Sequence, residues 1–222
     1  MTTPIRSLAA RYYTDPQVFR LETKGLLSRT WQFGCHASEL AQVGDYTTFE
    51  VAGESLFAIR GHDGEIRVFY NVCQHRAHQL VSGSGTTRVV VCPYHAWTYE
   101  LTGQLRAGPN INAVDGFDKS SICLTQIRVE EFLGFVFVNL DPDAAPMEDW
   151  FPGALAELQE WVPNWADLRP LEWIEILENC NWKVSVENYS ECYHCALNHP
   201  TFANGVIKPD SYDIQPQGKC LR

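Results

Sequence analysis

Two short loops, each pairing one cysteine with one histidine, constrain this chain more than any other part of its sequence. One residue separates Cys73 from His75, two residues separate Cys92 from His95, and sixteen residues separate the two motifs. Each motif follows a run of apolar and β-branched residues that is typical of a strand. The sequence therefore predicts a sheet whose loops bring two thiolates and two imidazoles to one metal site.

The mixed order of these ligands indicates a Rieske-type [2Fe–2S] cluster. Such a cluster has two cysteines on one iron and two histidines on the other, and the histidines raise its reduction potential. The alternative is a Cys2His2 zinc site, but zinc fingers place the two cysteines together and the two histidines together. We predict Cys73 and Cys92 on one iron, His75 and His95 on the other, and His78 as a loop residue near the cluster.

Around these loops the sequence predicts an antiparallel β-sandwich over residues 43–140. Short β-rich runs alternate with turn residues, for example at 61–64 and 102–103, which is the spacing of such a sandwich. The expected strands are residues 46–51, 56–60, 66–70, 89–91, 97–99 and 135–140.

Helical patterns flank this β domain. Asp15 and Pro16 form a helix-start signal, and apolar residues recur with roughly helical spacing over 16–31. A linker is expected at 141–146, where two prolines and two alanines occur, followed by helices at 154–161 and 182–197. The chain is therefore expected to be an α+β protein whose β domain is inserted between helical segments.

A second group of metal-ligand residues lies in the last of these helices. Glu187, Glu191 and His194 are spaced i, i+4 and i+7, which places them on one helix face. His199 would lie about 140° away on a continuous helix. Pro200 disfavours helical geometry at the residue before it, so we expect the helix to end there and His199 to turn back toward His194.

Two histidines and one carboxylate form the facial triad of non-haem Fe(II) oxygenases. A carboxylate three residues before His194 is either the third ligand or an outer partner that orients the imidazole, and spacing leaves both open. Cys192 and Cys195 offer two other interpretations, a CxxC zinc or redox pair and a pair of buried thiols. The four remaining cysteines outside the Rieske loops have no partner at metal spacing and are expected to be buried and inert: Cys35, Cys123, Cys180 and Cys220.

The composition excludes two classes of partner. The net charge is −10, with 27 acidic and 17 basic residues, so a nucleic acid is not expected to bind. The longest apolar run without a charge, residues 132–140, is far shorter than the about 20 residues that cross a bilayer. No secretory signal is recognisable, so we expect a cytoplasmic protein in which cysteines bind metal or are buried rather than form disulfides.

Together these motifs resemble the oxygenase (alpha) component of Rieske non-haem iron oxygenases, over nearly the whole chain. Within that family the chain is most similar to the branch that acts on carnitine, choline, glycine betaine and proline betaine. The strings that carry the resemblance are 45–46, 53–55, 69–73, 92–97, 181–183 and 188–195, with His199 and Pro200 after them.

The resemblance implies a domain order and a set of roles. Residues 1–42 would be the N-terminal helical part of a helix-over-sheet catalytic domain, 43–140 the Rieske domain, and 147–222 the start of the mononuclear iron domain. His194 and His199 would bind mononuclear Fe(II). Glu191 would be the catalytic bridge that links this iron by hydrogen bonds to a Rieske histidine of a neighbouring subunit.

The implied activity is O2- and NAD(P)H-dependent hydroxylation or C–N cleavage of a small quaternary ammonium compound, with carnitine the first candidate. The alternatives are an aromatic-ring hydroxylating dioxygenase, a Rieske ferredoxin-like electron carrier and a structural zinc module. The implied partners are a flavin and [2Fe–2S] reductase, using NADH or NADPH, and two further copies in a homotrimer.

The sequence also departs from the family. Proline usually stands at the position of Gln74 and glycine at that of Ala77. The family's third iron ligand is an aspartate far downstream, beyond the position of Arg222. The chain is therefore expected to be a C-terminally truncated fragment that has no activity alone.

Overall fold

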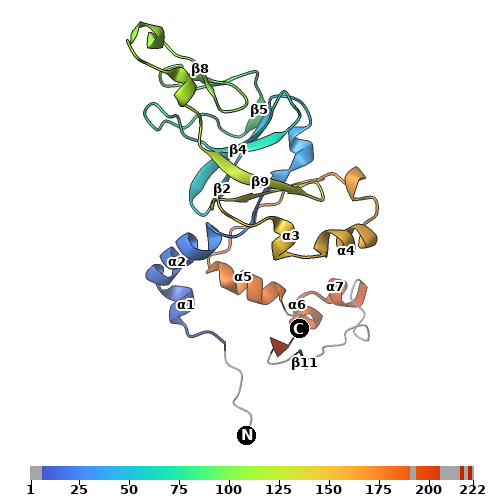
Figure 1. The fold of residues 1–222 in the computed structure, drawn as a ribbon. Helices are drawn as coiled ribbons and strands as arrows, with labels where there is room; N and C mark the ends of the chain where they lie inside the picture. Colours follow the sequence, from blue (N-terminus) through green and yellow to red (C-terminus); the bar gives the residue numbers. More distant parts are fainter. Residues whose placement is uncertain (1–6, 191–193, 206–215, 218–219, 222) are drawn as a thin grey trace. The chain divides into compact units, whose positions relative to one another are not determined.

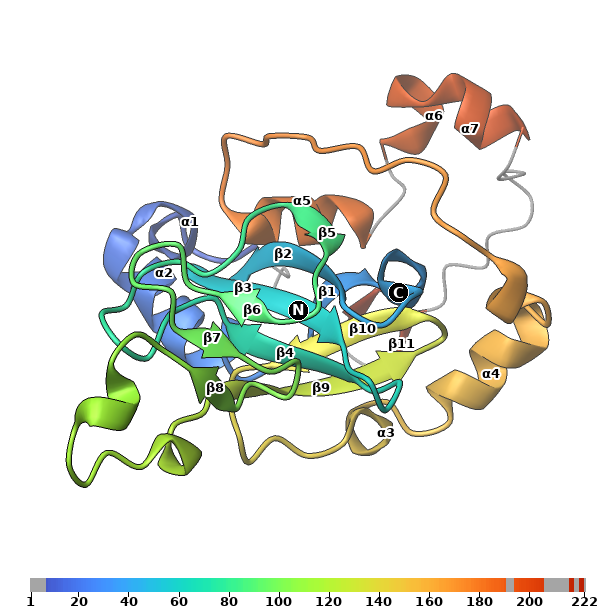
Figure 2. The same ribbon diagram turned by 90° about the horizontal axis from the view of Figure 1, so that it is seen from above.

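The computed structural model describes residues 7–190, 194–205, 216–217 and 220–221. The chain divides into two compact units, one formed by Leu21–Trp173 and the other by Met1–Arg20 with Ile174–Arg222. The helices and strands of both units are drawn in Figure 1 and Figure 2. Each unit is described by itself below.

The larger unit contains an antiparallel sheet of seven strands in the order β1-β10-β9-β4-β3-β2-β5. Its strands are β1 (Gln32–His36), β2 (Asp45–Val51), β3 (Glu54–Arg60), β4 (Ile66–Tyr70), β5 (Ser84–Thr86), β9 (Gln126–Phe132) and β10 (Phe135–Asn139). A three-stranded antiparallel sheet of β6 (Val90–Val91), β7 (Thr98–Tyr99) and β8 (Leu105–Ala107) belongs to the same unit.

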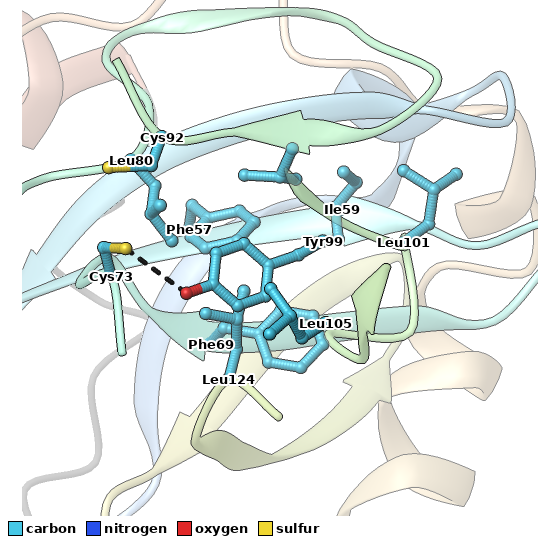
Figure 3. Packing of buried hydrophobic residues seen from close by; sticks show 11 residues of the cluster. Phe57, Ile59, Phe69, Cys73, Leu80, Cys92, Tyr99, Leu101, Leu105 and Leu124 are labelled. Carbon is cyan, nitrogen blue, oxygen red and sulfur yellow. Dashed lines mark hydrogen bonds between the residues drawn. The ribbon is translucent and has the colours of Figure 1, made fainter. Parts of the chain in front are cut away.

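Strand β3 has buried side chains on both of its faces. Successive side chains of a strand point to opposite faces, and here Phe57 and Ile59 join one hydrophobic core while Leu56 and Ala58 join a second. The first core also contains both cysteines of the Rieske-type loops (Figure 3). The loops are therefore anchored on a core of their own.

The α+β fold class is confirmed, and each predicted strand overlaps an observed one. In the larger unit four strands were not predicted, namely β1, β5, β8 and β9, and in the other unit the short strands β11 (Pro216–Gln217) and β12 (Cys220–Leu221) were not predicted. Strand β9 has a period-2 signal, because Ile127 and Val129 alternate with polar residues. Strand β1 lies in a segment interpreted as helical, yet it pairs with β10, with Gln32 opposite Val138.

The helix predicted at 16–31 is shorter in the structure. It consists of α2 (Pro16–Glu22) and a π-helical turn at Thr23–Leu27. Helix α1 (Arg11–Thr14) precedes it, and α3 (Met147–Trp150) and α4 (Ala154–Trp161) follow the sheet. Single 3-10 turns occupy η2 (Ala37–Leu40), η3 (Ile111–Ala113), η4 (Lys119–Ser121) and η5 (Trp165–Asp167).

The continuous helix predicted over 182–197 is wrong. Helix α5 (Trp182–Tyr189) ends at Ser190, whose hydroxyl donates to the carbonyl of Val186 at 2.7 Å. Such a side-chain bond to the backbone competes with helix continuation. Two short helices, α6 (Cys195–Asn198) and α7 (Pro200–Gly205), and two short strands, β11 (Pro216–Gln217) and β12 (Cys220–Leu221), complete the described part. Among the described residues no helix has the length and apolar character needed to span a membrane.

Candidate metal centres

The two Cys/His loops have the same backbone hydrogen bonds. In the first loop, the amide of Cys73 donates to the carbonyl of His78 at 2.8 Å, and the amide of Ala77 donates back to the carbonyl of Cys73 at 2.9 Å. In the second loop, the amide of Cys92 donates to Trp97 at 2.8 Å, and that of Ala96 donates to Cys92 at 3.0 Å. Each cysteine is thus held at the same point of an equivalent turn.

Both turns require a left-handed backbone at an alanine. The φ angle is 53° at Ala77 and 56° at Ala96, a region that costs a residue with a Cβ about 1–2 kcal/mol. Glycine adopts this region freely. Ala77, at a position where the family usually has glycine, therefore keeps the turn but adds local backbone strain.

The donor atoms separate into a buried pair and an outer pair. Cys73 and Cys92 are only 3% and 2% exposed, whereas His75 is exposed and His95 half-buried. The two imidazole rings lie 4.7 Å apart between centroids, and the ring of His75 stacks on Trp97 at 4.9 Å. Both histidines line an open hollow of about 910 Å3.

This arrangement fits a two-iron cluster. Each iron of such a cluster takes two protein ligands, so a cysteine pair inside and a histidine pair outside is the expected division. A structural zinc ion instead needs four donors around one point. Among the described residues, no three His, Cys, Asp or Glu side chains converge on a single ion position.

The surroundings of His95 favour its neutral form. Partial desolvation, followed by the nearby positive charges of His75, Arg76 and His78, lowers the pKa of His95 below its usual range. A neutral imidazole has the lone pair that a metal ligand needs. His78 itself lies in the loop as predicted, exposed, with its Nδ1 2.6 Å from the carbonyl of Gln79.

A residue that sequence reasoning missed lies beneath the first loop. Tyr99 is fully buried, and its hydroxyl lies 3.2 Å from Sγ of Cys73 (Figure 3). The same hydroxyl accepts from the amide of Gln74 at 3.1 Å. Burial and the hydrogen bond to Cys73 raise the pKa of Tyr99. Its proton is therefore available to the sulfur. No spacing rule singles out this tyrosine in the sequence.

The second pair of histidines converges as the sequence predicted. His199 lies between α6 and α7 with φ −129° and ψ 58°, and Pro200 begins α7. The rings of His194 and His199 lie 5.5 Å apart between centroids. The non-helical geometry before the proline is what turns His199 toward His194.

Contrary to the sequence prediction, the structure does not place Glu187 and His194 on one continuous helix. Glu187 lies on α5, which ends before His194, and its carboxylate accepts from the hydroxyl of Tyr13 at 2.5 Å. This bond raises the pKa of Tyr13. Glu191 and Cys192 lie outside the described residues.

Of the cysteines expected to be inert, Cys35 is buried, and burial raises the pKa of its thiol to about 12. The prediction is wrong for Cys123 and Cys180, which are exposed free thiols. Cys123 lies in the segment between β8 and β9, and Cys180 in the segment before α5, and neither belongs to a named strand or helix. Cys195 is buried, and the side chain of Cys220 lies outside the described part.

Comparison with known families gives two matches. The family described as the Rieske [2Fe-2S] domain matches residues 30–118. The family described as the ring hydroxylating alpha subunit (catalytic domain) matches residues 165–218. The first match contains all four residues of the Cys/His loops, and the second contains both converging histidines.

Curated relatives include carnitine monooxygenase oxygenase subunits. That of Escherichia coli K12 is 43% identical over 201 residues, which are 90% of this chain and 54% of the relative. That of Acinetobacter baumannii is 44% identical, over 88% of this chain and 53% of the relative. The chain thus spans about half the length of the curated relatives it matches.

Solved structures give the same result. A quaternary ammonium Rieske monooxygenase in complex with its substrate L-carnitine superposes with a TM-score of 0.84 at 44% identity, over 88% of this chain and 56% of that one. Naphthalene 1,2-dioxygenase with bound indole superposes with a TM-score of 0.75 at 30% identity, over 86% and 44%. From these similarities and the two family matches, the chain belongs to the alpha-subunit family of Rieske non-haem iron oxygenases, whose members use a [2Fe–2S] cluster and a mononuclear iron.

Proposed function

We propose that this chain belongs to the oxygenase component of a two-component Rieske oxygenase that hydroxylates, or cleaves the C–N bond of, a small carnitine-like quaternary ammonium compound, with O2 and NAD(P)H as co-substrates. The observation that carries the proposal is the pairing of two donor sets in one chain. The Cys/His loops supply one set, and His194 with His199 supplies the other. An electron-carrying ferredoxin would have no use for the second set.

The first set is assigned to the cluster. Cys73 and Cys92 would bind one iron and His75 and His95 the other. The cluster supplies one electron at a time at a raised potential. The chain's own contribution is to bury the sulfurs, to direct the Tyr99 hydroxyl toward one of them, and to keep the histidines at the surface, where an electron can leave.

The second set is assigned to mononuclear Fe(II), with His194 and His199 as ligands. Glu187 is already hydrogen-bonded to Tyr13, which supports leaving it out of the ligand set. Glu191 is proposed as the bridge between this iron and a Rieske histidine of a neighbouring subunit. Two neutral imidazoles lack the negative charge of a facial triad, so a carboxylate from outside this chain is proposed as the third ligand.

The proposed partners are a flavin and [2Fe–2S] reductase and two further copies of the oxygenase component in a homotrimer. One solved relative, a quaternary ammonium Rieske monooxygenase, is described in terms of inter-subunit electron transfer, which supports an assembly of several copies. A cytoplasmic location is proposed because Cys35, Cys123 and Cys180 are free thiols.

We also propose the domain order 1–42, 43–140 and 147–222. In this division the first segment contributes β1 to the sheet of the Rieske domain. The catalytic domain would then consist of residues from both ends of the chain. The compact unit formed by Met1–Arg20 and Ile174–Arg222 supports this arrangement.

A quaternary ammonium substrate is favoured over an aromatic ring because this chain has the higher sequence identity to an enzyme that acts on a quaternary ammonium compound. The alpha subunit of 2-aminobenzenesulfonate 2,3-dioxygenase from an Alcaligenes species is 33% identical, compared with 43% for the Escherichia coli carnitine monooxygenase subunit.

The proposal is tested with a chimera. The part of the Escherichia coli subunit beyond the matched region is fused after Arg222, and the protein is assayed with reductase, NADH or NADPH, and O2 on L-carnitine, glycine betaine and benzoate. We expect turnover of a quaternary ammonium compound by the chimera. The 222-residue chain alone should retain the cluster, bind Fe(II) weakly and give no turnover. Turnover of benzoate alone, or a colourless protein with one zinc per chain, would contradict the proposal.

A further inference from the structure

A cavity in the larger unit lies outside both candidate metal centres. Its volume is about 550 Å3, which is within the usual range for small-molecule sites. It is lined by the end of β1 and the residues after it, by the end of β9 and the turn between β9 and β10, and by the segment around η5. Its lining contains groups of both charges and one indole ring, from Glu131, Arg169 and Trp165.

His36 presents a buried hydrogen-bond donor at this cavity. Its side chain is 6% exposed, its Nδ1 accepts from the amide of Ser38 at 3.2 Å, and the hydroxyl of Ser38 lies 2.7 Å from the same nitrogen. A neutral imidazole whose Nδ1 accepts carries its proton on Nε2. Among the described residues Nε2 has no hydrogen-bond partner. A Cβ at Gly134 would lie 2.9 Å from Nε2, so the glycine is what leaves this donor open.

Arg169 presents a second donor group. Its Nη1 donates to the carbonyls of Ala166 at 2.7 Å and Leu168 at 2.6 Å. These bonds fix the guanidinium and leave its other edge, Nε with Nη2, without a partner in the described part of the chain. That edge has the fork geometry that binds a carboxylate with two parallel hydrogen bonds.

The same cavity also has features that favour a cation. Glu131 lines it and forms no ion pair with Arg169 or any other described residue. Trp165 is half-buried beside it. An indole face and a carboxylate together attract a cationic nitrogen.

We propose that this cavity binds a small zwitterion that carries a carboxylate and a cationic nitrogen. His36 and Arg169 would hold the carboxylate, and Glu131 and Trp165 would hold the nitrogen. A simple anion would satisfy only the first pair, and a simple cation only the second. The proposal is independent of the proposed function, because it concerns binding and requires neither iron nor turnover.

The test is calorimetric titration of the cluster-loaded chain with three probes. Glycine betaine carries both groups, acetate only the carboxylate and tetramethylammonium only the cation. We expect glycine betaine to bind at least about tenfold more tightly than either half, since a bidentate charged contact contributes that much. Absence of glycine betaine binding at millimolar concentration, or acetate binding equally tightly, would overturn the proposal.

Two variants locate the binding. Arg169→Gln and Glu131→Gln should each weaken glycine betaine binding about tenfold or more. Both side chains are exposed, so Glu131→Gln should leave thermal unfolding unchanged, and Arg169→Gln should lower the unfolding temperature only slightly, through loss of its two exposed hydrogen bonds. The matched controls Arg88→Gln and Glu50→Gln also remove exposed charges from the same unit, but outside the cavity lining, and should leave binding unchanged. Equal affinity in Arg169→Gln and Arg88→Gln would show that the zwitterion binds elsewhere.

Discussion

The hydroxyl oxygen of Tyr99 lies 3.2 Å from Sγ of Cys73, on the buried side of the cluster loops. The amide of Gln74 donates to the same oxygen. A cluster-bound Cys73 sulfur carries no proton and can only accept, so the tyrosine hydroxyl is then the donor of this hydrogen bond. A hydrogen bond to a ligand sulfur stabilises the additional negative charge of a reduced cluster.

Tyr99→Phe should therefore lower the reduction potential of the cluster. A hydrogen bond contributes about 0.5–1.5 kcal/mol, which corresponds to roughly 20–60 mV for a one-electron couple. Protein-film voltammetry measures the change. Tyr94→Phe, which removes an exposed hydroxyl beside His95, is the control. Equal potentials in Tyr99→Phe and the unmodified protein would show that the hydroxyl does not donate to the sulfur.

The histidines can be tested by changing the ligand type. His75→Cys or His95→Cys should shift the potential downward, because an added thiolate donates negative charge to the cluster. His78→Ala alters a neighbouring exposed loop histidine and should leave the potential and the visible spectrum unchanged. If His78→Ala bleaches the protein while His75→Cys has no effect, the ligand assignment is wrong.

The left-handed alanines give a prediction on stability. Ala77→Gly should raise the free energy of unfolding by about 0.5–1 kcal/mol, because relief of the left-handed strain exceeds the entropic cost of glycine. Ala77→Val should destabilise the loop and release iron. Ala52, at φ 53° in the turn after β2, is the matched control, since Ala52→Val should destabilise the fold without selective loss of the cluster. Denaturant unfolding and iron content decide between these outcomes.

The free thiols should differ in reactivity. The pKa of Cys35 is raised to about 12, so this thiol remains protonated at neutral pH and gains thiolate only as the pH rises toward that value. Cys180 is exposed and should react with iodoacetamide first. Cys123 is also exposed, but partial burial raises its pKa, so it should react more slowly. Peptide mapping after timed labelling gives the order, and labelling of Cys35 before Cys180 would contradict the structure.

The substitution Glu191→Gln in the chimera distinguishes two roles of this residue, a hydrogen-bonding bridge between the two metal sites and a direct ligand of the mononuclear iron. A bridging carboxylate is not bound to either metal, so iron and cluster content should be unchanged while turnover collapses. Pre-reduced cluster should then remain reduced with O2 and substrate present in stopped-flow absorbance. Glu187→Gln is the matched acidic control and should preserve most of the turnover. Loss of mononuclear iron from Glu191→Gln would make this residue a direct ligand.

The sequence predicts most of what depends on local patterns. The spacing of the cysteines and histidines identifies the two Cys/His loops as one metal site. Pro200 predicts the turn that brings His199 close to His194. The end of α5 at Tyr189 coincides with a hydrogen bond from the hydroxyl of Ser190 to the carbonyl of Val186, which a periodic pattern does not detect. Tyr99 is also invisible to such patterns, because its contacts with Cys73 and Gln74 come from tertiary packing between segments distant in the sequence. The same holds for the approach of Gly134 to His36. Strand β1 is short and its partner β10 lies about a hundred residues away, so its signal is not local.

The two cysteines of the cluster loops are themselves part of the first hydrophobic core, whereas the second core, on the opposite face of β3, contains neither of them. Binding of iron by these cysteines is therefore expected to stabilise the first core and not the second. When iron is scarce, newly made chains would fold the second core but leave the loop side loose and open to proteases.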